Sequence, residues 1–141
     1  MASNERAQWG LFIVRVMLGI VFIAHGSQKV LGLFGGTGLE GFVKWIGGYG
    51  VPSWLAYLGA FSEFTGGILL LLGIAAELGA LLVIPVMIGA VTLVHWGHGF
   101  FVQNKGFEYP LSLIFFALAI IVGGPGKYAL WDLCRRCRER A

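Results

Sequence analysis

Four long apolar runs, separated by short connections, constrain this 141-residue chain more than any other feature. A bilayer core of about 30 Å needs about 20 apolar helical residues per crossing, so the chain has room for about four crossings. Apolar residues make up 57% of the sequence and charged residues 12%, which is more apolar surface than a soluble domain of this size buries. The pattern therefore predicts an all-α integral membrane protein.

The four predicted crossings belong to one membrane domain, residues 1–141, which ends in a basic tail at residues 127–141. They cover residues 9–28, 54–73, 77–97 and 109–123. A cleaved signal peptide is the competing interpretation of the first run. However, Arg15 lies near the centre of that run and three more apolar runs follow, which is not typical of a signal peptide.

The connection between the first two crossings also has a helical pattern. Its apolar residues recur at helical spacing opposite Glu40 and Lys44, at Leu39, Phe42, Val43 and Ile46. This pattern predicts a short amphipathic helix at the membrane interface. The expected fold is thus a four-helix membrane bundle with one interfacial helix between helices one and two.

The distribution of Lys and Arg predicts the orientation, because cytoplasmic loops carry an excess of both. Six of these residues flank the chain ends and three lie in the connections that face the other way: Arg6, Lys127, Arg135, Arg136, Arg138 and Arg140 against Lys29, Lys44 and Lys105. Both termini are therefore expected on the cytoplasmic side. The net charge of +3 forms no basic stripe, so the expected partner is the lipid bilayer and not nucleic acid.

Two charged residues fall inside apolar runs, Arg15 in the first and Glu63 in the second. An unpaired charge there costs about 2.5 to 3.5 kcal/mol, so each requires a partner. Counted at about 1.5 Å per residue from the cytoplasmic ends, Arg15 lies roughly 9 Å deep and Glu63 roughly 15 Å deep. We therefore expect an Arg15–Glu63 ion pair, which either fixes helix register or handles a proton or a ligand headgroup.

A second polar group is expected at the opposite, non-cytoplasmic end, where it could line a pocket mouth. Its members are His25, Gln28, Lys29, His95, His98 and Glu108. One interpretation is an interfacial belt that caps helix ends, and another is proton exchange or contact with a quinone headgroup. A metal or haem site on His25, His95 and His98 is a weaker interpretation, because this spacing is common.

Cys134 and Cys137 form a C-x-x-C pair in the basic tail. The redox motif of this spacing requires a strand–helix context, which the tail does not supply. We interpret the pair as incidental or close to lipid. No dinucleotide, phosphate-loop or iron–sulfur motif occurs in the sequence, so no cofactor is encoded by a motif, and a quinone is the candidate ligand.

In combination, the polar and glycine-rich segments resemble the DoxX family of small bacterial membrane proteins over nearly the whole chain outside the tail. The matching segments are Arg15-x-x-Leu18-Gly19-x-x-Phe22-x-x-His25-Gly26-x-Gln28-Lys29, Gly35-Gly36-x-Gly38-Leu39, Gly50-Val51-Pro52, Glu63-x-x-Gly66-Gly67 and Gly106-Phe107-Glu108-Tyr109-Pro110. The resemblance implies a four-helix fold in the bacterial inner (plasma) membrane. It also marks Arg15, His25, Lys29, Glu63 and Glu108 as site candidates, whereas the Cys pair is not part of the pattern.

The resemblance also suggests a function. The family is related to DoxD, the membrane subunit of a thiosulfate:quinone oxidoreductase, and related proteins are linked to soluble sulfur or superoxide enzymes. We therefore expect a membrane subunit of an envelope oxidoreductase system that contacts a quinone or similar apolar partner, with a soluble redox enzyme and a homo-oligomer as expected partners. The alternative is a non-catalytic scaffold or small carrier, in which the Arg15–Glu63 pair is structural.

Overall fold

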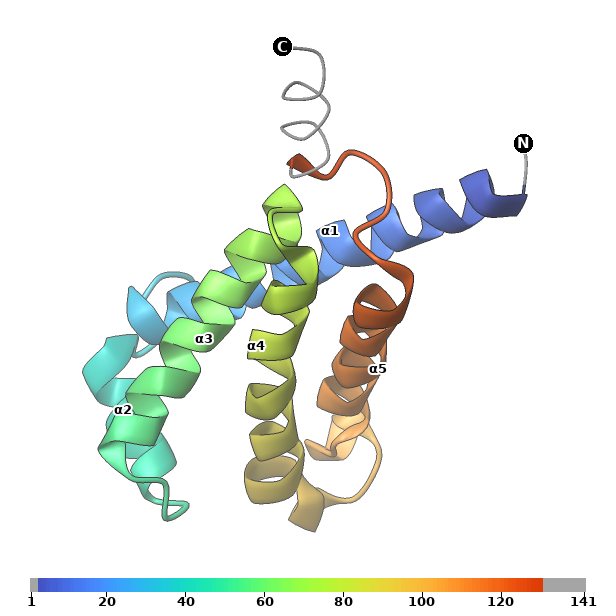
Figure 1. Cartoon of the computed structure of the whole chain (residues 1–141). Helices are drawn as coiled ribbons and strands as arrows, with labels where there is room; N and C mark the ends of the chain where they lie inside the picture. The colour runs from blue at the N-terminus through green and yellow to red at the C-terminus, as the bar shows by residue number, and fades with distance from the viewer. Residues whose placement is uncertain (1–2, 131–141) are drawn as a thin grey trace.

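The computed structural model describes residues 3–130, and this part of the protein is helical with no strand (Figure 1). Its helices are α1 (Ser3–Val30), α2 (Gly38–Gly47), α3 (Ser53–Leu72), α4 (Ala76–Gly89) and α5 (Glu108–Gly123). A π-helical segment, Ala90–His95, and a 3₁₀ turn, Trp96–His98, continue α4, and a second 3₁₀ turn covers Val102–Asn104. The predicted all-α membrane bundle with a short helix after the first long one is confirmed.

Three helical stretches in the described range are long and apolar enough to cross a membrane: Asn4–Val30, Ser53–Leu72 and Ala76–His98. Helix α5 is a shorter apolar helix of 16 residues that packs against α1 and α4. Large apolar side chains on different helices face outward, among them Ile13, Leu81 and Phe115, each more than half exposed. Such outward-facing apolar residues suit a bundle whose solvent is lipid.

Small residues set the register of α1 against α3. A Cβ atom on Gly19 would lie 2.6 Å from the backbone nitrogen of Leu71, and one on Gly26 would lie 2.6 Å from the Cα of Phe64. The two backbones therefore touch at both points, as small residues allow in membrane bundles. Seven residues forward on α1 correspond to seven residues back on α3, so the helices run antiparallel.

An apolar core lies between α1, α3, α4 and α5. Its fully buried members include Phe22 on α1, Leu70 on α3, Val83 on α4 and Ile120 on α5. Each helix contributes one apolar stripe to this core and turns another outward, which explains why the sequence runs are apolar nearly all round.

The two ends of the described chain lie at the same end of the bundle (Figure 1). The backbone amide of Lys127 donates to the carbonyl of Gln8 at 3.2 Å, and its ammonium group pairs with Glu5 at 2.8 Å. This arrangement requires the chain to return to its starting side, as an even number of crossings does.

Candidate functional site

Arg15 is buried, with 1% of its surface exposed, but it does not contact Glu63. The predicted Arg15–Glu63 ion pair is wrong. Instead, the guanidinium group donates to backbone carbonyls at the end of α3 and after α5. The acceptors are Pro125 at 2.7 Å, Leu70 at 2.8 Å, Leu71 at 3.1 Å, Lys127 at 3.1 Å and Tyr128 at 3.4 Å. A buried cation is thus satisfied by carbonyl dipoles without a carboxylate.

The register of α1 and α3 explains the error. Since Gly26 faces Phe64, Glu63 is level with Ser27, about twelve residues and roughly 18 Å along α1 from Arg15. The depth estimate assumed that the two apolar runs end at the same level. In the structure α1 begins at Ser3 and extends past the end of α3, so Arg15 lies beside the turn that follows α3.

Glu63 pairs with Lys29 near the other end of α1. The Glu63 side chain is 1% exposed and the Lys29 side chain 23% exposed, so the carboxylate is the deeper partner. The Lys29 ammonium also lies 5.0 Å from the centre of the Phe42 ring on α2, a cation–π distance. Both charges were predicted site residues, but Lys29 was expected at a pocket mouth and not with Glu63.

The segment between the 3₁₀ turn Trp96–His98 and α5 contains several backbone hydrogen bonds. The amide of Phe107 donates to the carbonyl of Gly99, and that of Glu108 donates to Phe100. Gly106 is buried and packs so closely on the Gly99 and Phe100 carbonyls that it leaves no room for a Cβ atom. We call this segment, residues 99–108, the α5 entry loop.

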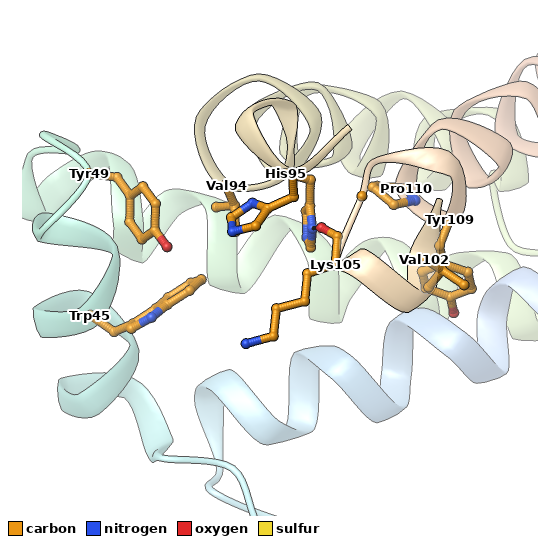
Figure 2. A pocket seen from close by; sticks show the side chains of 10 residues that line it. Trp45, Tyr49, Val94, His95, Val102, Lys105, Tyr109 and Pro110 are labelled. Atoms are coloured by element: carbon orange, nitrogen blue, oxygen red, sulfur yellow. Dashed lines mark hydrogen bonds between the residues drawn. The ribbon is translucent and has the colours of Figure 1, made fainter. Parts of the chain in front are cut away.

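A pocket of about 520 Å³ lies between α2 and the α5 entry loop (Figure 2). Trp45 on α2 and Tyr49 in the turn after it form one side, and His95 and Lys105 lie across from them (Figure 2). The other lining residues are Val94, His98, Val102, Gly106, Tyr109 and Pro110. The pocket therefore combines aromatic rings with imidazole, ammonium and hydroxyl groups, at the end of the bundle away from the termini.

The predicted polar residues at this end separate into two groups. His95 and His98 line the pocket, whereas His25 is outside the lining set; its ring lies 6.3 Å from that of Tyr109. Glu108 accepts the amide of Val102 at 2.7 Å and so caps the α5 entry loop. Gln28 donates to the carbonyl of Phe34 at 3.2 Å, a contact within the connection to α2.

The described residues contain no group of three or more His, Cys, Asp or Glu side chains that could hold a metal ion. In particular, His25, His95 and His98 do not converge as the metal-site interpretation requires. Cys134 and Cys137 lie outside the described residues, so their prediction stands as it was made.

Sequence reasoning missed Trp45, Tyr49 and Lys105 as pocket residues. Trp45 and Tyr49 are four residues apart and their rings are 5.4 Å apart, a spacing that places them on one face of a helical turn. That spacing was the available signal. Lys105 gave no signal, because only the folded entry loop brings it opposite α2.

The fold and its polar sites define a small helical membrane protein with charged groups held inside the bundle. The chain belongs to the DoxX family, whose sequence profile matches residues 10–96. It is 33% identical over 117 residues to “Putative oxidoreductase CatD” of Bacillus subtilis (strain 168), an alignment that covers 83% of this chain and 82% of that protein.

A second relative is the “Inner membrane protein YqjF” of Escherichia coli (strain K12), which is 26% identical over 121 residues, 86% of this chain and 88% of that protein. No solved structure gives a significant match to the chain. The region that matches the family profile includes Arg15, Lys29, Glu63 and the pocket residues up to His95. It ends before the α5 entry loop, which supplies the other side of the pocket.

Proposed function

We propose that this protein is a membrane subunit of an envelope oxidoreductase system and that it binds a quinone headgroup in the pocket between α2 and the α5 entry loop. The observation that carries the proposal is the composition of this pocket. It presents aromatic rings from α2 and the turn after it opposite polar groups from the π-helical segment and the entry loop.

The chemistry of the pocket suits a quinone, which is a flat ring with carbonyl acceptors on opposite edges. The rings of Trp45 and Tyr49 offer flat apolar surfaces for such a ring. The Lys105 ammonium and the Tyr49 hydroxyl offer donors for its carbonyls. The volume of about 520 Å³ falls within the range of small-molecule sites, roughly 300 to 1,000 Å³.

The surroundings of the pocket suit an apolar tail. Trp96 lies at the end of the crossing stretch Ala76–His98, Phe100 and Phe101 follow it, and all three are at least half exposed. These aromatic side chains are typical of the membrane interface, where a quinone headgroup meets water while its tail stays in lipid. A tail could therefore lie along the outside of the bundle without entering it.

Electrons would pass between the bound ligand and a soluble redox enzyme, because the proposed role of this chain is to provide the binding site. The description of CatD as an oxidoreductase supports this role. The inner-membrane description of YqjF supports a position in the bacterial inner membrane. With the excess of Lys and Arg at the chain ends, we propose that both termini face the cytoplasm.

The rival function is a non-catalytic scaffold or small carrier. The Arg15 contacts and the Lys29–Glu63 pair favour it in one respect, since both join elements of the fold and neither lines the pocket. Buried polar groups of this kind serve structure as readily as chemistry. The oxidoreductase function requires the pocket to bind a quinone and the scaffold does not, so the experiment measures binding at the pocket.

The experiment is a titration of the purified protein, in lipid nanodiscs, with the short-tailed quinone decylubiquinone while tryptophan fluorescence is recorded. We expect saturable quenching that Trp45→Phe removes and that Trp54→Phe, on the lipid-facing surface of α3, retains. Lys105→Met should weaken binding about tenfold, which corresponds to about 1.4 kcal/mol. Lys44→Met, an exposed change on α2 outside the pocket, should leave binding unchanged.

Quenching that rises without saturation, equally in all four variants, would show only quinone dissolved in lipid. That result would remove the quinone site and favour the scaffold. Flux of a solute across vesicles that contain the protein would favour the carrier instead.

A further inference from the structure

The geometry of His95 fixes which of its ring nitrogens carries a proton. Nδ1 of His95 lies 2.6 Å from the carbonyl oxygen of Lys105. A carbonyl oxygen only accepts hydrogen bonds, so Nδ1 must be the donor. The neutral imidazole then has an unprotonated Nε2, which is free to accept a proton. His95 is therefore held in the tautomer that a general base requires.

The pocket lining contains basic side chains and no acidic ones. Lys105 and two histidines line it, and no Asp or Glu is among the lining residues. Glu108, the acidic residue of the neighbouring entry loop, accepts the Val102 amide. The ion pairs found between residues 3 and 130 are Lys29–Glu63 and Lys127–Glu5, so neither involves Lys105. An anion in the pocket would meet positive charge without a competing carboxylate.

The backbone holds Lys105 in place. Lys105 has φ +62°, in the left-handed region that a non-glycine residue adopts at a cost. Its amide donates to Val102 at 2.8 Å and its carbonyl accepts from His95, so hydrogen bonds on both sides fix the conformation. The backbone of the residue that carries the cation is therefore held against the base before any ligand binds.

From this arrangement we propose that the pocket takes the reduced, hydroxyl-bearing form of its ligand, a quinol, and removes a proton from it. Nε2 of His95 accepts the proton from a ring hydroxyl, and the Lys105 ammonium stabilises the phenolate that remains. In this step one O–H bond breaks and one N–H bond forms. No electron moves, and imidazolium and phenolate are the products. The inference rests on the proposed function, because it assigns the ligand form to the same pocket.

The step can be observed without a redox partner. The probe is 4-nitrophenol, whose phenolate absorbs visible light while the neutral phenol does not. It is added to the nanodisc protein at a pH below the pKa of the free probe. We expect the phenolate-to-phenol ratio of the bound probe to exceed that of the free probe by about tenfold or more, since an opposite charge nearby favours ionisation.

Variants then test the two residues. Lys105→Met and His95→Asn should each lower the ratio, because each removes one of the two positive charges that face the phenolate after the transfer. The Asn amide can still donate to the Lys105 carbonyl, so the entry loop keeps its hydrogen bond. His25→Asn is the matched control: Nδ1 of His25 lies 2.9 Å from the Val21 carbonyl, but His25 is outside the pocket. It should leave the ratio unchanged.

Three outcomes overturn the inference. In the first, the bound probe is no more ionised than the free probe while decylubiquinone still binds. This result would support the quinone site and contradict the proton transfer. In the second, the ratio falls in His98→Asn but not in His95→Asn, so His95 is not the base. In the third, neither probe binds, and both the inference and the proposed function fail.

Discussion

Nε of Arg15 on α1 donates to the carbonyl oxygen of Pro125 at 2.7 Å, a contact between positions 110 residues apart in the chain. The same guanidinium group binds Leu70 at the end of α3. One buried side chain therefore ties together α1, α3 and the segment after α5. A guanidinium group carries five N–H donors in a fixed plane and can serve five carbonyls, whereas an ammonium group has three donors.

Arg15→Met should destabilise the fold strongly, since it leaves buried carbonyls from two segments without their donor. Hydrogen bonds to charged groups contribute about 1.5 to 3 kcal/mol each and are not additive, so we expect a loss of about 3 to 5 kcal/mol in the free energy of unfolding. Denaturant unfolding of the purified protein in detergent measures it. Arg6→Met, at an exposed position on the same helix, is the control and should change little. Equal stabilities for the two variants would contradict a structural role for Arg15.

The Lys29–Glu63 pair should respond asymmetrically to mutation. Lys29→Met leaves a carboxylate buried without its partner, for which we expect a cost of about 3 to 5 kcal/mol. Glu63→Gln should cost less, because the partly exposed Lys29 ammonium can turn toward water. The double variant Lys29→Met/Glu63→Leu should recover much of the loss. The same unfolding assay measures these changes. A larger loss of stability for Glu63→Gln than for Lys29→Met would contradict the finding that Glu63 is the more deeply buried partner.

A double-mutant cycle tests the corrected pairing directly. Residues about 18 Å apart along a helix should act independently, so the effects of Arg15→Met and Glu63→Gln should add within about 0.5 kcal/mol. Lys29→Met and Glu63→Gln should instead be clearly non-additive. Strong coupling between Arg15 and Glu63 would restore the pair that the sequence predicts and the structure does not contain.

Gly106→Ala should disrupt the α5 entry loop, because the added methyl group would overlap the carbonyls of Gly99 and Phe100. We expect the pocket to lose decylubiquinone binding by about tenfold or more, since Lys105 is positioned by this loop. Gly97→Ala is the matched control, as a Cβ atom there would meet nothing within 4 Å. If Gly106→Ala binds decylubiquinone as well as Gly97→Ala does, the loop does not shape the site.

The proposed orientation predicts opposite accessibility for α2 and the basic tail. In intact cells, a membrane-impermeant thiol reagent should label Lys44→Cys in a background that lacks Cys134 and Cys137. The native cysteines should become labelled only after the inner membrane is opened, because the excess of Lys and Arg keeps the chain ends inside. Labelling of Cys134 and Cys137 from outside would reverse the orientation.

The bundle could be predicted from the sequence because its cause is local. An apolar run of about 20 residues has one stable conformation in lipid, and amphipathic spacing at residues 39–46 gives a helix wherever the interface lies. The candidate residues could also be identified, since a charge inside such a run is costly enough to require a partner. Arg15 and Glu63 were found in this way, whereas Lys29 was found as one of the polar residues that gather at the non-cytoplasmic end.

The partners of those charges could not be predicted, and only the tertiary structure decided them. Contacts between distant segments depend on helix register, which Gly19 against Leu71 and Gly26 against Phe64 set through backbone contact. The register cannot be derived from the ends of the apolar runs. The sequence therefore predicted that Glu63 pairs with Arg15, whereas in the structure Glu63 pairs with Lys29. The pocket has the same origin: Trp45 and Lys105 are 60 positions apart in the sequence, and only folding places them on opposite sides of one cavity. Sequence thus determined which groups must be satisfied, and packing determined what satisfies them.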